Sequence, residues 1–218
     1  MKPKRIPKLI TTADEVFTIC QQLQTEPFLA LDTEFIRETT FFPKIALIQI
    51  ANQKQAWLID PTVLGKEDLA PLFQLLTDPK ILKVIHASYA DQEVLYWAYG
   101  CIVEPVLDTS VAAALCGIGD NVGLQKLLKD ELGVSIPKGR SRVKWLSRPL
   151  SEELLVYAEE DVLHLVELGD SIKNRCEKLS RWEWVLEESQ SSKDQFDVSP
   201  EVMAQKLGKS AHLDAIGR

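Results

Sequence analysis

The chain has 218 residues, 45% of them hydrophobic and 26% charged, a balance that is typical of a globular protein and excludes a disordered, collagen-like or coiled-coil chain. No apolar run approaches the roughly 18 residues that a membrane span needs, and no apolar stretch of a secretory signal follows the N-terminal basic residues, so we predict a cytoplasmic protein with no membrane partner. The formal net charge of −7 argues against a sequence-independent coat on a polyanion, but local charge at a site decides nucleic-acid binding.

The predicted elements alternate between helix and strand along the chain. Thr12 can cap a helix over 12–24, whose apolar residues recur at helical spacing. Strands are predicted at 28–34, 45–51, 56–60, 83–87 and 103–107. Further helices are predicted at 69–76, 89–99, 109–116 and 123–132. The first two strands are apolar on both faces, as in a sheet that is covered on both sides.

The longest helical pattern begins after Pro149, with Ser151 as its N-cap, and continues to about residue 188. This order of elements predicts the α/β class, with a mixed β-sheet flanked by helices. We predict a basic N-terminal segment at 1–10, one domain at 11–189, and a polar linker and tail at 190–218 with a short helix over 200–207.

The cysteines and histidines do not indicate a zinc site. The four cysteines, at positions 20, 101, 116 and 176, have no C-x-x-C spacing, so we expect most of them to be small core residues. Three histidines in the whole chain are too few for a His-rich zinc cluster.

Two carboxylates end the first predicted strand, FLALDTEF, at Asp32 and Glu34. Side chains two residues apart on a strand project from the same face, so these two carboxylates lie side by side. Such a pair repels, which raises the pKa of both groups, and it is stable in the ionised form only beside cations. The alternative is a strand end that emerges into solvent.

Three further polar residues follow apolar segments. Asp91 comes shortly after a predicted strand, in the first turn of a predicted helix, where an acid can simply serve the positive end of the helix. Tyr157 and Asp161 lie one turn apart on one helical face, beside the apolar stripe. A hydrogen bond between them that holds two helices together is the structural alternative to a role in catalysis.

These residues stand in motifs that resemble a known enzyme family. The motifs are DTEF at 32–35, HAxxxD at 86–91, LDT at 107–109 and RPLxxxxxxYAxxD at 148–161. Their order and separation resemble ribonuclease D, in the tyrosine-containing subgroup of the DEDD exonucleases, from about residue 10 to residue 179. The resemblance implies a ribonuclease H-like fold for the domain at 11–189, with 3′-5′ exonuclease activity.

The resemblance also implies the roles of five site residues. Asp32, Glu34, Asp91 and Asp161 are expected to bind two divalent metal ions, Mg²⁺ or Mn²⁺, and Tyr157 to orient the attacking water. The chemistry is consistent, because carboxylate oxygens suit these hard cations and two such ions stabilise both the attacking and the leaving oxygen.

Two departures from the family bear on the choice of substrate. Ribonuclease D normally continues into helical HRDC domains, and this chain stops too early for one, so we expect a catalytic domain alone. The family also tends to have Ser-Asp before the tryptophan of its third region, where this chain has Val143 and Lys144 before Trp145.

A basic segment precedes the last motif and is the predicted substrate channel. Its cations, with no acid between them, are Lys138, Arg140, Arg142, Lys144 and Arg148. Basic side chains hold phosphates, and Trp145 either stacks on a base or packs in the core. The alternative is a solvated basic loop.

The motif neighbours complete the candidate site. The resemblance places Thr33 and Phe35 near the terminal nucleotide, although Phe35 is equally consistent with the core. His86 resembles a family histidine near the site, or is a structural histidine. Gln49 is expected to be a buried polar group that needs hydrogen-bond partners, with no chemistry assigned to it, and Asp108 is expected to cap the helix that follows it.

We therefore predict a metal-dependent 3′-5′ exoribonuclease that releases nucleoside 5′-monophosphates from single-stranded RNA. One alternative is an exonuclease on single-stranded DNA, because the preference for RNA comes from the family resemblance alone. The other is a nucleic-acid-binding module that has lost catalysis, which the five intact site positions argue against.

Overall fold

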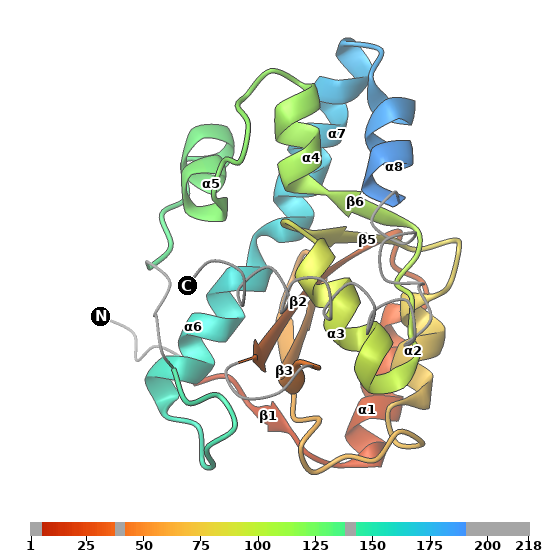
Figure 1. Cartoon of the computed structure of the whole chain (residues 1–218), viewed down its shortest axis with the longest axis vertical. Coiled ribbons are helices and arrows are strands. Elements are labelled where there is room, and N and C mark those ends of the chain that lie inside the picture. Colours follow the sequence, from red (N-terminus) through yellow and green to blue (C-terminus); the bar gives the residue numbers. More distant parts are fainter. Residues whose placement is uncertain (1–5, 38–41, 138–142, 191–218) are drawn as a thin grey trace, which may run out of the picture.

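The computed structural model describes residues 6–37, 42–137 and 143–190, which form a mixed six-stranded sheet between helices (Figure 1). The strands, in the order in which they lie in the sheet, are β1 (Leu9–Ile10), β4 (Ala56–Ile59), β3 (Lys44–Ala51), β2 (Phe28–Ile36), β5 (Leu82–Ile85) and β6 (Val106–Asp108). β3 is antiparallel to both β2 and β4, and the other neighbours pair in parallel. The predicted α/β class is confirmed.

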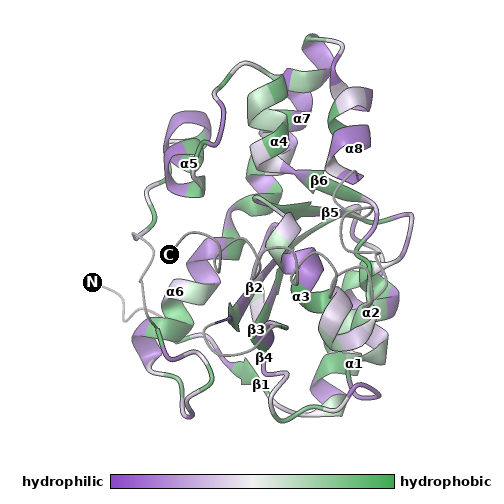
Figure 2. Ribbon diagram, in the orientation of Figure 1, coloured by the Kyte–Doolittle hydropathy of each residue, from purple (hydrophilic) through white to green (hydrophobic). Residues whose placement is uncertain are grey.

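Helices cover both faces of this sheet. They are α1 (Ala13–Leu23), α2 (Ala70–Leu76), α3 (Tyr89–Tyr99), α4 (Thr109–Leu115), α5 (Leu124–Leu132), α6 (Glu152–Leu163), α7 (Leu165–Lys178) and α8 (Trp182–Gln190). Figure 2 shows hydrophobic and hydrophilic bands alternating along them, as expected for helices that bury one side only. Within the described ranges, no helix is both long and apolar enough to span a bilayer.

Alternate residues of β2 enter different apolar clusters. Leu29 and Leu31 pack with residues of α1 and α2, whereas Ala30 packs with residues of α4 and α7. A third cluster lies beneath α6 and includes Leu47, Trp145 and Ala158. The strand is therefore buried on both faces, as its apolar sequence predicts, and its polar end emerges where α6 crosses the sheet.

The long helix predicted from 151 to about 188 is three helices in the structure. α6 ends at Leu163 and α7 begins at Leu165, with His164 as the cap residue between them, and Ser180, with a φ of 54°, separates α7 from α8. The apolar residues of the predicted long helix are divided between two clusters accordingly. Ala158 packs in the cluster beneath α6, whereas Ile172 packs with residues of β5 and α4. Apolar periodicity persists through both breaks, so it predicts the buried side of each helix but not the change of direction.

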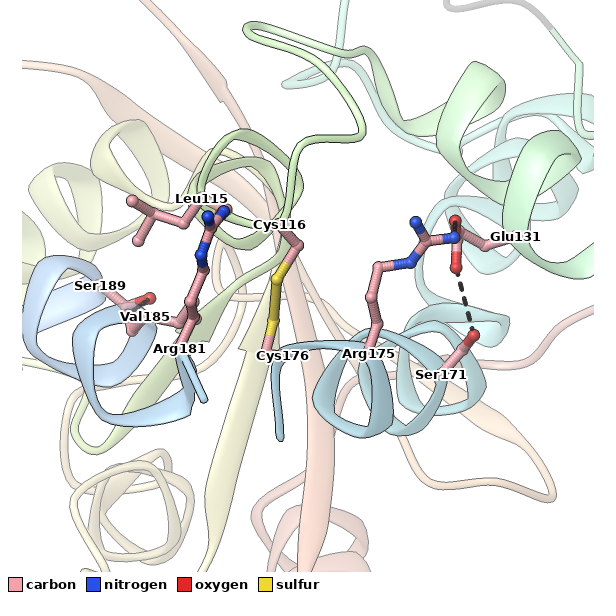
Figure 3. Close-up of a disulfide and its surroundings, with 9 residues drawn as sticks. All are labelled: Leu115, Cys116, Glu131, Ser171, Arg175, Cys176, Arg181, Val185 and Ser189. Atoms are coloured by element: carbon pink, nitrogen blue, oxygen red, sulfur yellow. Dashed lines mark hydrogen bonds and ion pairs between the residues drawn. A yellow bond between two sulfur atoms is a disulfide. The ribbon is translucent and has the colours of Figure 1, made fainter. Parts of the chain in front are cut away.

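Two cysteines form a disulfide that the sequence does not predict. Cys116 follows α4 and Cys176 lies in α7, 60 residues later (Figure 3). Cys20 and Cys101 are free and buried, as expected of core residues. Pairing of distant cysteines depends on which helices pack together, and no local spacing reveals that.

Candidate active site

A cavity of about 470 Å³ opens where the end of β2 meets α5 and α6. Six of the residues predicted for the site line it: Asp32, Thr33, Glu34, His86, Tyr157 and Asp161. The motifs that lie up to 129 positions apart in the chain thus converge on one cavity, because β2 and α6 pack across each other.

Three carboxylates form a compact group in this cavity. One oxygen each from Asp32, Glu34 and Asp161 lies within 4.8 Å of the other two. The first two project from one face of β2, and the third reaches them from α6, which crosses the same face. The predicted pairing of Asp32 with Glu34 on one face is therefore borne out by their positions.

Asp91 lies beside this group and is held by Thr33. Its Oδ1 accepts hydrogen bonds from the Thr33 amide at 3.0 Å and from the Thr33 hydroxyl at 2.5 Å. The Asp91 side chain is buried, at 6% exposure, and its charge raises the pKa of both Asp32 and Glu34. Asp91 thus approaches the cluster from α3, on the side opposite α6.

Burial raises the pKa of all four carboxyl groups, and repulsion from neighbouring carboxylates adds to this rise. Burial is the larger cause, and it raises the pKa of Asp32 well above its ordinary value, with the charges of Asp91 and Glu34 adding to it. The pKa of Glu34 rises to about 8, that of Asp91 to about 7 and that of Asp161 to about 6. Hydrogen bonds from Thr33 lower the pKa of Asp91, and a hydrogen bond from Tyr157 lowers that of Asp161, so both oppose the effect of burial.

This electrostatic arrangement suits cations. In the described part of the chain, no lysine or arginine forms an ion pair with Asp32, Glu34, Asp91 or Asp161. Buried acids without a basic partner are stabilised in the ionised form by a bound cation, and oxygen donors at this spacing suit Mg²⁺ or Mn²⁺. The four residues therefore fit the divalent metals that the family resemblance implies.

Tyr157 faces the same cavity from α6. Its hydroxyl hydrogen-bonds to Asp161, one turn further along the helix, and burial raises the pKa of the phenol well above its ordinary value. The hydroxyl therefore stays protonated and can donate a hydrogen bond. The Trp145 ring packs 6.2 Å from the Tyr157 ring, between centroids, and fixes its other side.

The residues predicted to bind substrate lie in different environments. His86 lines the cavity, and its Nδ1 lies 2.9 Å from the Thr109 hydroxyl; burial lowers its pKa, against the opposing effect of Asp108. Phe35 is half-buried and follows an irregularity in the pairing of β2 with β3 after Glu34. Phe35 is not among the residues that line the cavity.

The basic segment is described only in part. Lys138, Arg140 and Arg142 lie outside the described residues, and Lys144 is exposed. Trp145 is 5% exposed in the cluster beneath α6, so stacking on a base would require it to leave that cluster, and this role stays a prediction. Arg148 is not free to hold a phosphate, because its guanidinium pairs with Asp60.

The start of α5 contributes residues that the sequence interpretation does not include. Gly123, Leu124, Gln125 and Lys126 line the same cavity as the carboxylates. Arg175 and Ser171 of α7 bind Glu131 and thereby tie α5 to the rest of the fold (Figure 3). The helix itself is predicted, but its place beside the site depends on packing between distant segments.

Comparison with known proteins agrees with this geometry. The 3′-5′ exonuclease family matches residues 7–177. Ribonuclease D of Gluconacetobacter diazotrophicus is 36% identical over 203 residues, which cover 92% of this chain and 51% of that protein. The chain thus spans about half the length of the curated relatives that it matches.

Solved structures show the same fold. Escherichia coli RNase D, described as an exoribonuclease involved in structured RNA processing, superposes with a TM-score of 0.84 and 33% identity, over 88% of this chain and 51% of that one. NrnC of Brucella melitensis, with bound Mg²⁺, gives a TM-score of 0.69 and 28% identity over 78% of this chain and 83% of that one. NrnC has also been solved bound to pGG, with a TM-score of 0.70, 29% identity and coverage of 78% and 82%. The predicted ribonuclease H-like fold and the resemblance to ribonuclease D are confirmed.

Proposed function

Because this chain belongs to the 3′-5′ exonuclease family, we propose that it hydrolyses single-stranded RNA from the 3′ end and releases nucleoside 5′-monophosphates. The observation that carries the proposal is the group of Asp32, Glu34 and Asp161 beside Tyr157 in one cavity. The same residues lie in the motifs by which the sequence resembles ribonuclease D, so sequence and geometry support one site.

Asp32, Glu34, Asp91 and Asp161 hold two divalent cations, Mg²⁺ or Mn²⁺, in this proposal. Bound there, the cations lower the pKa of water and stabilise the charge that develops on phosphate oxygens. The burial that raises the pKa of these carboxyl groups also lowers the local dielectric, which strengthens their attraction for a cation. A structure of NrnC with bound Mg²⁺ supports this choice of cation.

Tyr157 orients the attacking water. Its phenol stays protonated and its ring is fixed between the cavity and Trp145, so the hydroxyl has a defined direction. A hydrogen bond to Asp161 further fixes the direction of the hydroxyl, so that the hydroxyl can hydrogen-bond to a water beside that carboxylate.

Thr33, Phe35 and His86 hold the terminal nucleotide, and Lys138, Arg140, Arg142, Lys144 and Trp145 hold the strand that leads to it. Thr33 and His86 have the strongest support, because both line the cavity that contains the carboxylates. RNA is proposed over DNA because Escherichia coli RNase D is described as an exoribonuclease. DNA hydrolysis and binding without catalysis are the alternatives, and a cytoplasmic location is part of the proposal.

Digestion of labelled oligonucleotides tests the proposal. Single-stranded RNA and DNA of equal sequence are incubated with Mg²⁺, Mn²⁺ or EDTA, and the products are identified by chromatography. We expect stepwise shortening of 5′-labelled RNA, nucleoside 5′-monophosphate as product, and no reaction with EDTA. The matched control is Asp32→Asn with Asp161→Asn, which keeps the side-chain volumes. Internal fragments, or digestion that persists in EDTA, would contradict the proposal.

A further inference from the structure

Gln49 is a buried polar residue of the sheet that the proposed chemistry does not use. It lies on β3 directly opposite Asp32 on the antiparallel strand β2. Directly opposed side chains in such a pair project from the same face, roughly 5 Å apart at Cβ. The pairs before and after it on this face are Ala30 with Ala51 and Glu34 with Leu47. Gln49 therefore stands at the inner edge of the carboxylate group.

The burial of Gln49 is complete and its hydrogen bonding is partial. It has 0% exposure, its Nε2 donates to Asp32 Oδ2 at 3.5 Å, and its buried Oε1 has no hydrogen-bond partner among the described residues. An unpaired amide oxygen in an apolar environment costs stability, so methionine or leucine would be the better residue if packing alone mattered. The presence of an amide here calls for a role beyond packing.

The chemistry of the amide fits a role toward Asp32. A carboxylate binds a cation best when it is oriented in advance, and one oxygen that accepts a hydrogen bond leaves the other free. A neutral donor does this without cancelling the negative charge of the group. Lysine or arginine at this position would place a competing positive charge beside Asp32.

We infer that Gln49 is a positioning residue that orients Asp32 for cation binding. The inference rests on the proposed function, in which Asp32 holds a divalent cation. It assigns Gln49 no contact with RNA. Partners that orient metal ligands typically account for about 10-fold to 100-fold in metal affinity, so the expected effect is measurable.

Mn²⁺ binding to the full chain, followed by calorimetry and electron paramagnetic resonance, tests the inference without any activity measurement. Gln49→Met keeps the length of the side chain but removes the donor. We expect its Kd for Mn²⁺ to rise by about 10-fold or more. We expect its unfolding temperature to equal or exceed that of the parent, because the unpaired oxygen is gone. At saturating Mn²⁺ the KM for RNA is expected to stay unchanged.

Lys83→Met is the matched control. Lys83 is also fully buried on a strand, but its Nζ donates to the carbonyl oxygens of Asp78 and Glu104, outside the cavity lining. This variant changes stability while its Kd for Mn²⁺ stays that of the parent. A Kd for Gln49→Met within twofold of the parent value would overturn the inference.

A second measurement keeps the test decisive if Gln49→Met fails to fold. The side-chain amide resonances of Gln49 in the parent are followed by NMR during Mg²⁺ titration, and a shift that saturates with the metal supports the inference. Unchanged resonances overturn it. A parent that binds Mn²⁺ but does not digest RNA refutes the proposed function and leaves the comparison of Kd values valid. A parent that binds no Mn²⁺ overturns both.

Discussion

Thr33 links two of the motifs through a single side chain. Its neighbours Asp32 and Glu34 face α6, whereas its amide and hydroxyl both donate to Asp91 of α3. Thr33 lies between two of the proposed metal ligands and holds a third, so the spacing of the DTEF motif places polar groups on both faces of the strand end. These two hydrogen bonds also oppose the effect of burial on the pKa of Asp91.

Thr33→Val tests this link. Valine keeps the shape and the backbone donor but removes the hydroxyl, so Asp91 loses one of its two hydrogen bonds. We expect the free energy of unfolding to fall by about 1 kcal/mol and the rate of RNA digestion to fall about 10-fold or more, since Asp91 is less fixed. Urea unfolding and initial rates measure the two effects. Thr33→Ser keeps the hydroxyl and is expected to retain most activity; a Ser variant as slow as the Val variant would argue against the link.

Tyr157→Phe separates orientation of water from packing. The ring and its contact with Trp145 remain, while the hydroxyl that bonds to Asp161 is lost. If the hydroxyl positions the attacking water, kcat should fall by about 10²-fold or more with little change in KM. Single-turnover digestion of RNA at saturating Mg²⁺ gives the rate. Unchanged turnover with a lowered unfolding temperature would show that the hydroxyl only joins parts of the fold.

At the scale of elements, Arg148 fixes the segment before α6 to the sheet. Its Nε and Nη2 donate to the two Asp60 oxygens at 2.5 and 2.7 Å, and Nη2 also donates to the Ala46 carbonyl oxygen of β3 at 2.7 Å. Nη1 donates to the carbonyl oxygen of Trp145 at 2.7 Å. The last cation of the basic segment therefore holds Trp145 in the cluster on which α6 packs.

Arg148→Met tests this anchor. It leaves the Asp60 carboxylate, 2% exposed, with its hydrogen bonds from Thr62 but without its cationic partner, so we expect the free energy of unfolding to fall by about 3 kcal/mol or more. Urea unfolding at neutral pH measures it. Lys126→Met is the control, because its pair with Asp130 is exposed and should contribute less than about 1 kcal/mol. Equal effects of the two substitutions would refute the anchor.

The sequence predicts the elements of this fold better than their directions. Apolar stripes locate α1, α3 and α5 closely, because local periodicity decides which residues are buried. The divided helix after Pro149 and the short strand β1 are not predicted, since both depend on contacts with distant segments. For the same reason the basic run correctly marks a departure in local charge but does not distinguish the paired Arg148 from the exposed Lys144.

In the site, too, the sequence predicts what local patterns determine and not what depends on contacts between distant segments. The motifs identify the three clustered carboxylates and Tyr157, because their order and spacing are visible in the chain. The connection of Thr33 to Asp91 and the place of α5 are not visible there. Gln49 is predicted as a buried polar residue in need of partners, and the register of β2 with β3 supplies the partner that its own strand does not show.

At the scale of the whole molecule, the four clustered carboxyl groups make the stability of the fold depend on pH. Burial and repulsion raise the pKa of Asp32, Glu34, Asp91 and Asp161 above their unfolded values near 4, to about 8 for Glu34. The folded protein then binds more protons than the unfolded chain between about pH 4 and pH 8. Without metal, the contribution of these groups to stability therefore decreases as the pH rises through this window.

Divalent metal should reverse that trend. Cations favour the ionised carboxylates, so the rise in unfolding temperature on addition of Mg²⁺ should be larger at pH 8 than at pH 5.5. Thermal scans at both pH values with Mg²⁺ or EDTA measure this difference. Asp32→Asn with Asp161→Asn is the control and should show little dependence on Mg²⁺ at either pH. If Mg²⁺ raises the unfolding temperature of the parent equally at both pH values, the electrostatic account is contradicted.

The Cys116–Cys176 bond encloses one part of the active site in a covalent ring and leaves the other part outside that ring. It closes a ring that contains α5 and α6, and so carries Tyr157 and Asp161, whereas Asp32, Glu34 and Asp91 precede the ring. A protease that cuts one peptide bond within 117–175 opens the ring without releasing a fragment. The nicked protein should run as one band on a denaturing gel and separate into two only after reduction, so the two halves of the site stay tethered after the backbone between them is broken.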